Sequence, residues 1–425
     1  MTHRLAVALS FFLFSCKVFA GLHFTTVPFA YPAGLIPDSI AVTDVNLDGR
    51  PDFVVAHSQD TFISVLTNRG DGVFVAAPSI SLGPCGKVIA DDVNGDGAPD
   101  IIAMLISVSG FVVLTNTGGN FAFASTNTGL TALPAGFIAV DLDGDGWKEV
   151  VSTYGGRPLQ VYTNNHLGTF SFFAEYSTGG VYPWALAPGD FNSDGSPDLL
   201  VIHSDNPPTF MTNNGQGILV RGSVISGYGT GGAPRTADMN HDMLIDIMLG
   251  NRLLTNNGAG EFSLANSNIA GSSAMLQEVA DLNSDGWPEA LAFGFSGTLN
   301  VRTNDHTNIF STAVELQTGG TGFGFLKATD VNGDGSTDLI YGLSGSVNLS
   351  FGYSTPPLSI ERDAPNNVLV SWPFTTPLTY LQSATNCGAT PLDWTSRTPS
   401  TNAALRRLEL SVPASRPMEF FRLMQ

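Results

Sequence analysis

The chain is built from short runs in which hydrophobic and polar residues alternate, separated by stretches rich in glycine, asparagine and aspartate. The first unit shows the order, with runs at residues 39–44, 53–58, 62–68 and 73–81 (SIAVTD, FVVAHS, FISVLTN and VFVAAPSIS). Alternation with a period of two is typical of β-strands that bury one face. Four short strands per unit predict the blade of a β-propeller.

Each unit also contains a nine-residue polar loop, which in the first unit is DVNLDGRPD at residues 44–52. Successive copies start 48, 49, 49, 48, 43 and 49 residues apart, at Asp44, Asp92, Asp141, Asp190, Asp238, Asp281 and Asp330. A Thr-Asn pair that closes the third strand repeats with the same period, at Thr67-Asn68, Thr115-Asn116, Thr163-Asn164, Thr212-Asn213, Thr255-Asn256 and Thr303-Asn304. Seven copies at a nearly fixed period predict an all-β, seven-bladed propeller.

The two ends of the array predict how the ring closes. After its polar loop the last unit supplies only two strands, so its fourth strand is missing. Residues 22–29 contain an apolar run in which Phe24 lies 20 residues before the first loop, as Phe121 lies before the third. We therefore predict that the N-terminal strand completes the last blade, which leaves no open sheet edge at the seam.

Changes in composition divide the chain into three segments. Residues 1–20 read as a secretory signal peptide, because Arg4 precedes an apolar run and a small-residue cleavage site. We predict the propeller at residues 21–355 and a small C-terminal β-sandwich domain at 356–425. The protein is expected to be secreted or to lie at the cell surface, with a lipoprotein anchor through Cys16 as the alternative. No later apolar run is long enough to span a bilayer.

The net charge bears on the class of partner, and the cysteine count bears on disulfide bonds. The net charge is −19, and 22 of the 37 acidic residues lie in the seven loops, so nucleic acid is not an expected partner. The chain is expected to be monomeric. Cys85 and Cys387 are too few for a disulfide framework. Two free thiols are predicted, with a bridge between the two domains as the alternative.

The loop pattern D-x-[DN]-x-D-G-x-x-D offers oxygen atoms from side chains at positions 1, 3, 5 and 9 and from a backbone carbonyl at position 7. Glycine at position 6 permits a positive φ. Such oxygen donors suit calcium. Magnesium and manganese are alternative cations, and a polar turn that binds no metal is the alternative to a metal site. The candidate metal ligands are Asp44, Asn46, Asp48, Arg50, Asp52, Asp92, Asn94, Asp96, Ala98, Asp100, Asp141, Asp143, Asp145, Trp147, Glu149, Asp190, Asn192, Asp194, Ser196, Asp198, Asp238, Asn240, Asp242, Asp246, Asp281, Asn283, Asp285, Trp287, Glu289, Asp330, Asn332, Asp334, Ser336 and Asp338.

We expect up to seven calcium ions, because three or four carboxylates within nine residues repel one another without a cation. The fifth copy, at residues 238–246, departs from the pattern with Met243 in place of glycine and His241 at position 4. The expectation of a metal is weakest there. The third and sixth copies end in Glu149 and Glu289, whose carboxylates reach further than that of aspartate.

The seven loops resemble those of the FG-GAP/VCBS repeat family, the calcium-binding blades also found in the head of integrin α subunits, over residues 22–353. The resemblance implies a seven-bladed propeller with the metal loop between the first and second strands of each blade. It also implies that the loops lie on the face opposite the ligand-binding face. The C-terminal segment is similar to compact β-domains that close many secreted bacterial proteins, through its SWP, YLQS and FFRL runs.

The connections on the opposite face do not repeat and carry aromatic and basic residues among glycines. Exposed aromatic side chains there suit recognition of a glycan or an extracellular protein, so we predict adhesion or recognition with structural metal loops. The candidate ligand-binding residues are Tyr154, Arg157, Tyr182, Trp184, His203, Tyr228, Arg235 and Phe323. The alternative is a polysaccharide-active lyase or dehydratase, since related propellers include such enzymes, with Tyr154, His203 and Arg235 as its first acid/base candidates. No nucleophile or cofactor motif is found, and no catalytic residue is assigned.

Overall fold

The computed structural model describes residues 22–424 apart from 25–28, 71, 107–109, 118–120, 128–133, 155, 157, 205, 226–231, 270–273, 295–296, 319–323, 354–358, 365–366, 374–379, 385–394, 398–399, 403–406 and 414–419. Side chains are described up to residue 352, except at 23, 29, 121–127, 134, 154, 274–275 and 312–313. Every regular element in this part of the chain is a β-strand, and no helix that could cross a membrane is found there. The predicted signal peptide lies outside the described residues.

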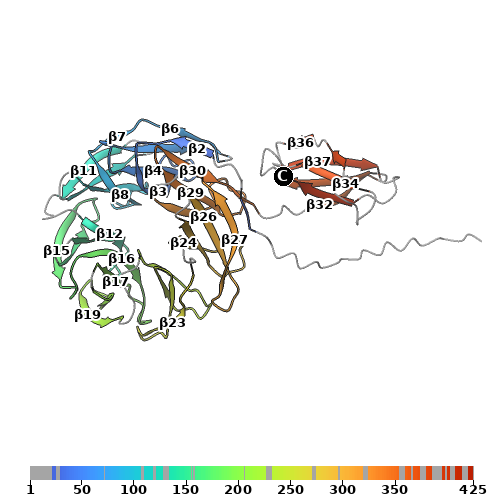
Figure 1. Ribbon diagram of the computed structural model, residues 1–425. Coiled ribbons are helices and arrows are strands. Elements are labelled where there is room, and N and C mark those ends of the chain that lie inside the picture. Colours follow the sequence, from blue (N-terminus) through green and yellow to red (C-terminus); the bar gives the residue numbers. More distant parts are fainter. Residues whose placement is uncertain are drawn as a thin grey trace, which may run out of the picture.

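Seven antiparallel sheets stand around a common centre, which confirms the seven-bladed propeller (Figure 1). Each of the first six blades runs outward in chain order, from an inner first strand to an outer fourth strand. The strands of blades 1 to 3 are β3 (Pro37–Thr43), β4 (Asp52–His57), β5 (Phe62–Asn68) and β6 (Phe74–Ala76), with β7 (Ile80–Ser81) also paired to β5; β8 (Cys85–Asp91), β9 (Asp100–Leu105), β10 (Gly110–Asn116) and β11 (Phe121–Asn127); and β12 (Pro134–Val140), β13 (Glu149–Tyr154), β14 (Leu159–Asn164) and β15 (Phe170–Tyr176).

Blades 4 to 6 repeat this arrangement, and the short spacing after the fifth loop is absorbed by shorter strands in blade 5. Their strands are β16 (Pro183–Gly189), β17 (Asp198–His203), β18 (Thr209–Asn213) and β19 (Leu219–Val224); β20 (Arg235–Ala237), β21 (Asp246–Leu249), β22 (Arg252–Asn256) and β23 (Phe262–Asn266); and β24 (Ala274–Ala280), β25 (Glu289–Gly294), β26 (Thr298–Asn304) and β27 (Phe310–Gln317).

The seventh blade closes the ring with the N-terminal strand, as predicted. Its first three strands are β28 (Leu326–Thr329), β29 (Asp338–Leu343) and β30 (Ser346–Ser350), followed by β31 (Gly352–Tyr353). The chain start supplies β1 (His23–Phe24), which pairs with β31, and β2 (Phe29–Pro32), which pairs with β30. Phe24 pairs with Gly352 as Phe121 pairs with Asn116 in blade 2, so the spacing argument placed this strand correctly.

The hydrophobic core is divided into seven clusters, each lying between two neighbouring blades. The second strands contribute most completely, because every residue of β4, β9, β17, β25 and β29 is buried. Apolar side chains on both faces of a sheet are expected where each sheet packs between two others. At the seam, Phe24 packs into the cluster between blades 6 and 7, which ties the N-terminal strand to both.

The C-terminal segment forms two antiparallel sheets of its own, consistent in strand content with the predicted β-domain. One sheet comprises β32 (Ser359–Ala364), β33 (Asn367–Pro373), β37 (Arg407–Pro413) and β36 (Ser400–Asn402), and the other β35 (Thr395–Arg397), β34 (Tyr380–Ala384) and β38 (Phe420–Met424). The predicted sandwich packing of these sheets and the domain boundaries stay predictions. Cys85 is a buried free cysteine, and Cys387 lies outside the described residues.

Candidate metal loops

The seven polar loops join the first strand of each blade to the second, and all seven adopt one backbone conformation. Two positions in each loop are left-handed. At position 6, φ lies between 67° and 89° in Gly49, Gly97, Gly146, Gly195, Met243, Gly286 and Gly335. At position 4, φ lies between 59° and 77° in Leu47, Gly95, Gly144, Ser193, His241, Ser284 and Gly333. The sequence predicted the turn at position 6, whereas the one at position 4 is hidden because several residue types occupy it.

In each loop the early carboxylates are arranged around the turn by backbone N–H groups. In the first loop the Asp44 carboxylate accepts from the backbone N–H groups of Asp48 (3.0 Å) and Gly49 (2.6 Å). Asn46 Oδ1 also accepts from Asp48 N–H at 3.0 Å, and Asp48 Oδ1 accepts from Arg50 N–H at 3.0 Å. These bonds fix the three side chains of positions 1, 3 and 5 around one short turn, as an Asx-turn does.

The carboxylate at position 9 is buried and joins three segments of its blade. Asp100 accepts from Val93 N–H at position 2 of the loop (3.1 Å) and from the N–H of Asn116, which ends the third strand (2.8 Å). Burial is the main cause that raises the pKa of this group to about 6, and the two N–H donors oppose the shift. Burial likewise raises the pKa to about 6 in Asp198 and Asp246, to about 7 in Glu149 and Glu289, and to about 8 in Asp338.

The donor set fits a hard divalent cation. All the side-chain donors are carboxylate or amide oxygens, which are the ligands that calcium takes. In the third loop, ligand oxygens of Asp141, Asp143 and Glu149 lie within 4.8 Å of one another. These oxygens come from positions 1, 3 and 9, so the loop brings the predicted ligands from its two ends together. The longer side chain of Glu149 still reaches the group.

The fifth loop keeps the common fold despite its divergent sequence. Met243 has φ 67° and its N–H donates to Asp238 Oδ2 at 2.9 Å, as Gly49 N–H does to Asp44 Oδ2 in the first loop. The Met243 side chain is 91% exposed, so it gains little from packing. The divergence therefore stores backbone strain without displacing the donors.

Met243→Gly is expected to raise the free energy of unfolding by about 0.5 to 1 kcal/mol, because it relieves a left-handed conformation that is costly for a residue with a Cβ. Met243→Ala is the matched control, since it removes the long side chain and keeps the Cβ. Urea denaturation of the three proteins measures the effect. An alanine variant as stable as the glycine variant would contradict this explanation.

The raised pKa values at position 9 predict that the metal-stripped protein loses stability as pH rises. In the unfolded chain these carboxyls titrate near pH 4, whereas in the folded protein Asp100 titrates at about 6 and Asp338 at about 8. Between pH 4 and these folded-state pKa values the folded protein therefore binds more protons than the unfolded chain. The resulting contribution to the free energy of unfolding is fully present below about pH 4 and is lost as the pH rises through 6 to 8. Denaturation of stripped protein at pH 5 and pH 8 tests this, and equal or greater stability at pH 8 would contradict it. Asp338→Asn should reduce the difference.

The Thr-Asn pairs proved to have a structural role that the sequence did not reveal. The Asn side chain that closes the third strand donates to the backbone carbonyl at position 2 of the preceding blade's loop. We call these contacts the asparagine latches: Asn68 to Val331 (2.7 Å), Asn116 to Val45 (2.8 Å), Asn164 to Val93 (3.0 Å), Asn213 to Leu142 (2.7 Å), Asn256 to Phe191 (2.9 Å) and Asn304 to Met239 (3.0 Å). Gly352 occupies the seventh position, so the seam between blades 6 and 7 has no such side chain.

Stacked tryptophan and histidine rings support two of the loops from outside. Trp147 at position 7 stacks on His166 with ring centroids 4.9 Å apart, and Trp287 stacks on His306 at 4.8 Å. Both histidines also hydrogen-bond the position 5 carboxylate of the same loop, at 2.9 and 3.1 Å. His241 of the fifth loop covers the other face of Trp287 at 4.9 Å. These rings brace the loops and link blade 5 to blade 6.

Two candidate ligand residues are held inside the structure. His203 is fully buried on β17, and its ring nitrogens lie 3.0 Å from Thr178 Oγ1 and 3.3 Å from the Pro207 carbonyl oxygen. Arg235 is half-buried on the inner strand β20, and its side chain donates to the carbonyl oxygens of Gln277 and Pro234. His203 is therefore a structural part of its blade, and Arg235 belongs to the centre of the ring.

The other predicted ligand residues are only partly described. Tyr182 lies between blades 3 and 4, is 55% exposed and has φ 52°, and Trp184 is half-buried on β16. The side chain of Tyr154 and residues Arg157, Tyr228 and Phe323 lie outside the described part of the chain. Tyr182 is thus the described candidate that is presented to solvent on the face opposite the metal loops.

Comparison with known proteins agrees with this geometry. The model of the FG-GAP-like repeat matches residues 44–103, 92–152, 141–201, 190–249 and 281–341. A crystal structure of BBS1N in complex with ARL6DN, soaked with mercury, is similar with a TM-score of 0.54 at 12% identity, covering 78% of this chain and 98% of that one. The same complex soaked with lead gives 0.53 at 12% identity, over 76% and 95%. No curated protein sequence matches the chain.

Proposed function

Because the chain belongs to the FG-GAP-like repeat family, we propose that it is a secreted, calcium-stabilised recognition module, with adhesion to an extracellular protein or glycan as its role. The observation that carries the proposal is the contrast between the two ends of the blades. At one end seven loops share one conformation and one set of oxygen donors. At the other end the connections differ from blade to blade, which is where specificity is expected.

Calcium would be held by side-chain oxygens at loop positions 1, 3, 5 and 9 and by the carbonyl at position 7, and would neutralise the clustered carboxylates. The chain's own residues already order the loop through the backbone N–H bonds to Asp44 and Asn46. The position 9 carboxylate ties that order to the third strand. Each metal-bound loop would therefore stabilise its own blade. The metal would make the blade more rigid, and the ligand would bind at the opposite face.

A protein partner is favoured over a glycan by one similarity of fold. The related propeller BBS1N was crystallised in complex with ARL6DN, so a propeller of this shape can bind a protein. On this chain Tyr182 offers a solvent-exposed aromatic ring on the non-repeating face. Such rings give large contact area at low entropic cost.

Binding to panels of extracellular proteins and of glycans, with calcium present, tests the proposal. Tyr182→Ala should weaken the binding found in either panel. Leu167→Ala is the matched control, because Leu167 is 73% exposed in a turn at the metal-loop end. Absence of binding in both panels, or loss of binding only in the Leu167 variant, would overturn the proposed recognition face.

A further inference from the structure

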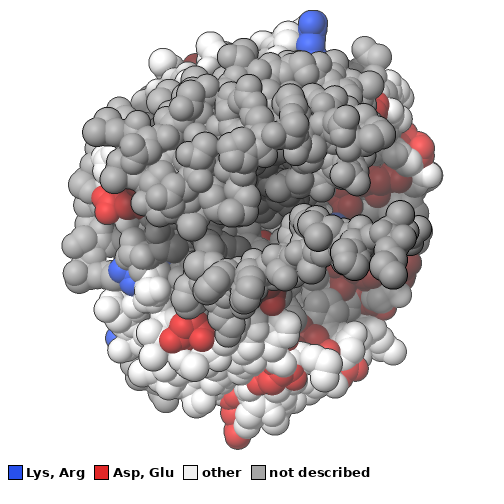
Figure 2. All heavy atoms as spheres, turned by 90° about the vertical axis from the view of Figure 1, so that its right-hand side faces the viewer, with Lys and Arg blue, Asp and Glu red and all other residues white. Residues whose placement is uncertain are grey.

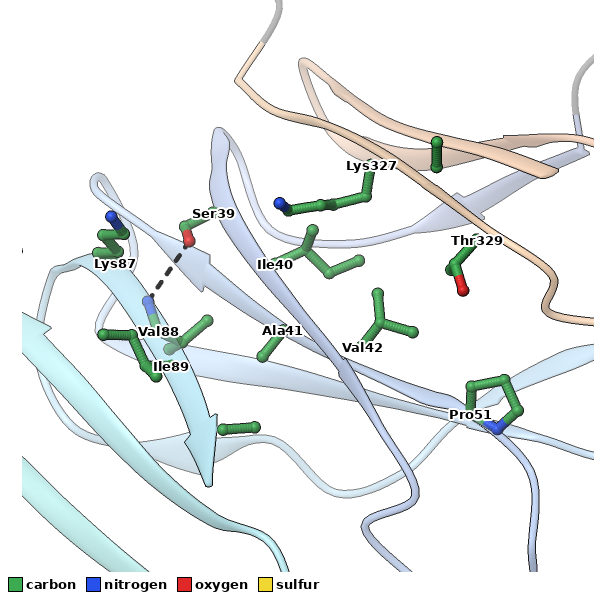
Figure 3. Close-up of a pocket in the computed structure, with 12 residues that line it drawn as sticks. Ser39, Ile40, Ala41, Val42, Pro51, Lys87, Val88, Ile89, Lys327 and Thr329 are labelled. Carbon is green, nitrogen blue, oxygen red and sulfur yellow. Dashed lines mark hydrogen bonds between the residues drawn. The ribbon is translucent and has the colours of Figure 1, made fainter. Parts of the chain in front are cut away.

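The centre of the ring contains a cavity of about 530 Å³ between the inner strands of blades 1, 2 and 7. Its walls are residues 39–42 of β3, 87–90 of β8 and 327–329 of β28, with Pro51 at one end (Figure 3). Val42, Ile89 and Ala328, which are half-buried, make part of the wall apolar. A volume of this size is typical of a small-ligand site.

Two basic side chains from separate blades, Lys87 and Lys327, line this cavity, and a third, Arg235, acts on Lys87 through its charge. Figure 3 shows Lys87 and Lys327 reaching toward the same end of the cavity, on either side of Ser39. Arg235 lies on the inner strand β20 of blade 5. Burial, together with the smaller effects of the Arg235 and Lys327 charges, lowers the pKa of Lys87 to about 8, so both cations lie close enough to act on Lys87.

The described residues balance only part of this positive charge. Lys327 Nζ pairs with Glu278 Oε2 at 2.9 Å. Burial lowers the pKa of Arg235, and the charge of Glu278 opposes that shift, so Glu278 acts on both cations. None of the ion pairs among the described residues includes Lys87. Three cations against one carboxylate leave an excess of two positive charges. The protein as a whole carries a net charge of −19, with 37 acidic against 18 basic residues, and Figure 2 shows red acidic groups spread over the face in view.

We propose that the central cavity is a binding site for a dicarboxylate. Burying an excess of positive charge is unfavourable because the charges lose hydration, unless an ion of opposite charge lies close by. A charged channel with low-dielectric walls also concentrates ions of the opposite sign. Lys87 supplies the main counter-charge and Lys327 a second one at the half-exposed side. Ser39 Oγ accepts from Val88 N–H at 3.4 Å, so its own O–H is left to donate to a carboxylate.

The apolar walls select the class of anion. A dicarboxylate has a short aliphatic chain between its charged ends, and this chain fits against Val42, Ile89 and Ala328, whereas phosphate or sulfate offers nothing to those walls. Two carboxylates match the excess of two positive charges. The carboxylates come either from a free small dicarboxylate or from two acidic side chains of a partner. The second source rests on the proposed role in protein recognition, and the first does not.

Calorimetric titration of the full chain with succinate and, separately, with a blocked tetraglutamate peptide tests the site. Ionic strength is kept constant with chloride, and calcium is in excess. We expect saturable binding of at least one probe, weakened about tenfold by Lys87→Gln through loss of a charge-assisted contact. Lys327→Gln should weaken it less, because Lys327 is partly exposed and already paired. Arg221→Gln, on the outer strand β19, should leave it unchanged.

Each outcome of this experiment has a defined meaning. Succinate binding identifies a free dicarboxylate as the source, and binding of the peptide alone identifies acidic side chains of a partner. Lys87→Gln should melt no lower than the wild type without ligand, because it removes an unbalanced charge. No saturable binding of either probe, or undiminished binding by Lys87→Gln, would overturn the site. Calcium-dependent melting of the same samples separates this failure from a failure of the proposed function.

Discussion

Removing divalent cations is expected to lower the melting temperature of this protein by about 10 °C or more. The carboxylates of each loop repel one another without a cation. A site kept at about 100 times its dissociation constant adds about 2.7 kcal/mol to the free energy of unfolding, so two such sites add about 5 kcal/mol. In a domain of this size about 1 kcal/mol shifts the melting temperature by about 2 °C. Differential scanning calorimetry of stripped protein, before and after calcium addition, measures the shift.

Loop variants show whether the effect arises at the proposed sites. The double variant Asp141→Asn and Asp143→Asn alters the loop in which ligand oxygens of positions 1, 3 and 9 lie within 4.8 Å of one another, and should lose part of the calcium response. Asp305→Asn is the matched control, because Asp305 lies in an exposed turn outside the loops. Magnesium and manganese additions establish the cation preference. A melting temperature that neither chelation nor calcium addition changes would overturn the metal role.

The repeat pattern predicted the architecture because every blade carries the same local signals. Seven polar loops set the blade count, and the position of Phe24 relative to the first loop predicted closure by the N-terminal strand. The structure confirms both, since Phe24 pairs with Gly352 at the register that Phe121 has with Asn116. These features can be predicted from the sequence because turn-forming residues and the alternation of strand residues determine structure over only a few positions.

Contacts between blades were not predictable in this way. The Asn116 side chain repeats visibly in the sequence, yet its latch partner Val45 lies 71 residues earlier, and nothing local indicates it. Arg235 and Lys327 both lie three residues before their loops, whereas Lys87 lies five residues before its own, so the period alone does not bring the three together. They meet because all inner strands converge on one axis. His203 was read as a surface candidate, whereas the same geometry places it inside blade 4.

The latches and the position 9 carboxylates form one continuous system around the ring. Asp100 accepts from the backbone N–H of Asn116, while the Asn116 side chain donates to Val45 O in blade 1 and to Pro99 O in its own blade. Order in one loop therefore depends on the third strand of its blade and on the loop before it. A cation bound in one loop would accordingly stabilise its neighbours as well. The seam between blades 6 and 7 lacks a latch and relies on Phe24 and its apolar cluster.

Asn213→Ala is expected to destabilise the protein by about 3 kcal/mol. Asn213 is 3% exposed, and its Nδ2 donates to Leu142 O in blade 3 (2.7 Å) and to Pro197 O in its own blade (3.1 Å). The substitution leaves both carbonyls without this donor and frees Gly215 N–H, which bonded to Asn213 Oδ1 at 3.2 Å. Each buried polar group that loses its partner costs about 1 to 3 kcal/mol. Urea denaturation monitored by tryptophan fluorescence measures the change.

Thr212→Ala is the matched control, because Thr212 precedes Asn213 on β18 and its hydroxyl donates to Val220 O at 3.2 Å on the exposed side. We expect a loss of about 0.5 kcal/mol there, and equal losses in the two variants would contradict the latch. The slope of the transition carries further information. Since the Asn213 latch crosses from blade 4 to blade 3, a lower midpoint with an unchanged slope means that the ring unfolds as one unit. A shallower slope means that cutting one latch lets part of the ring open first.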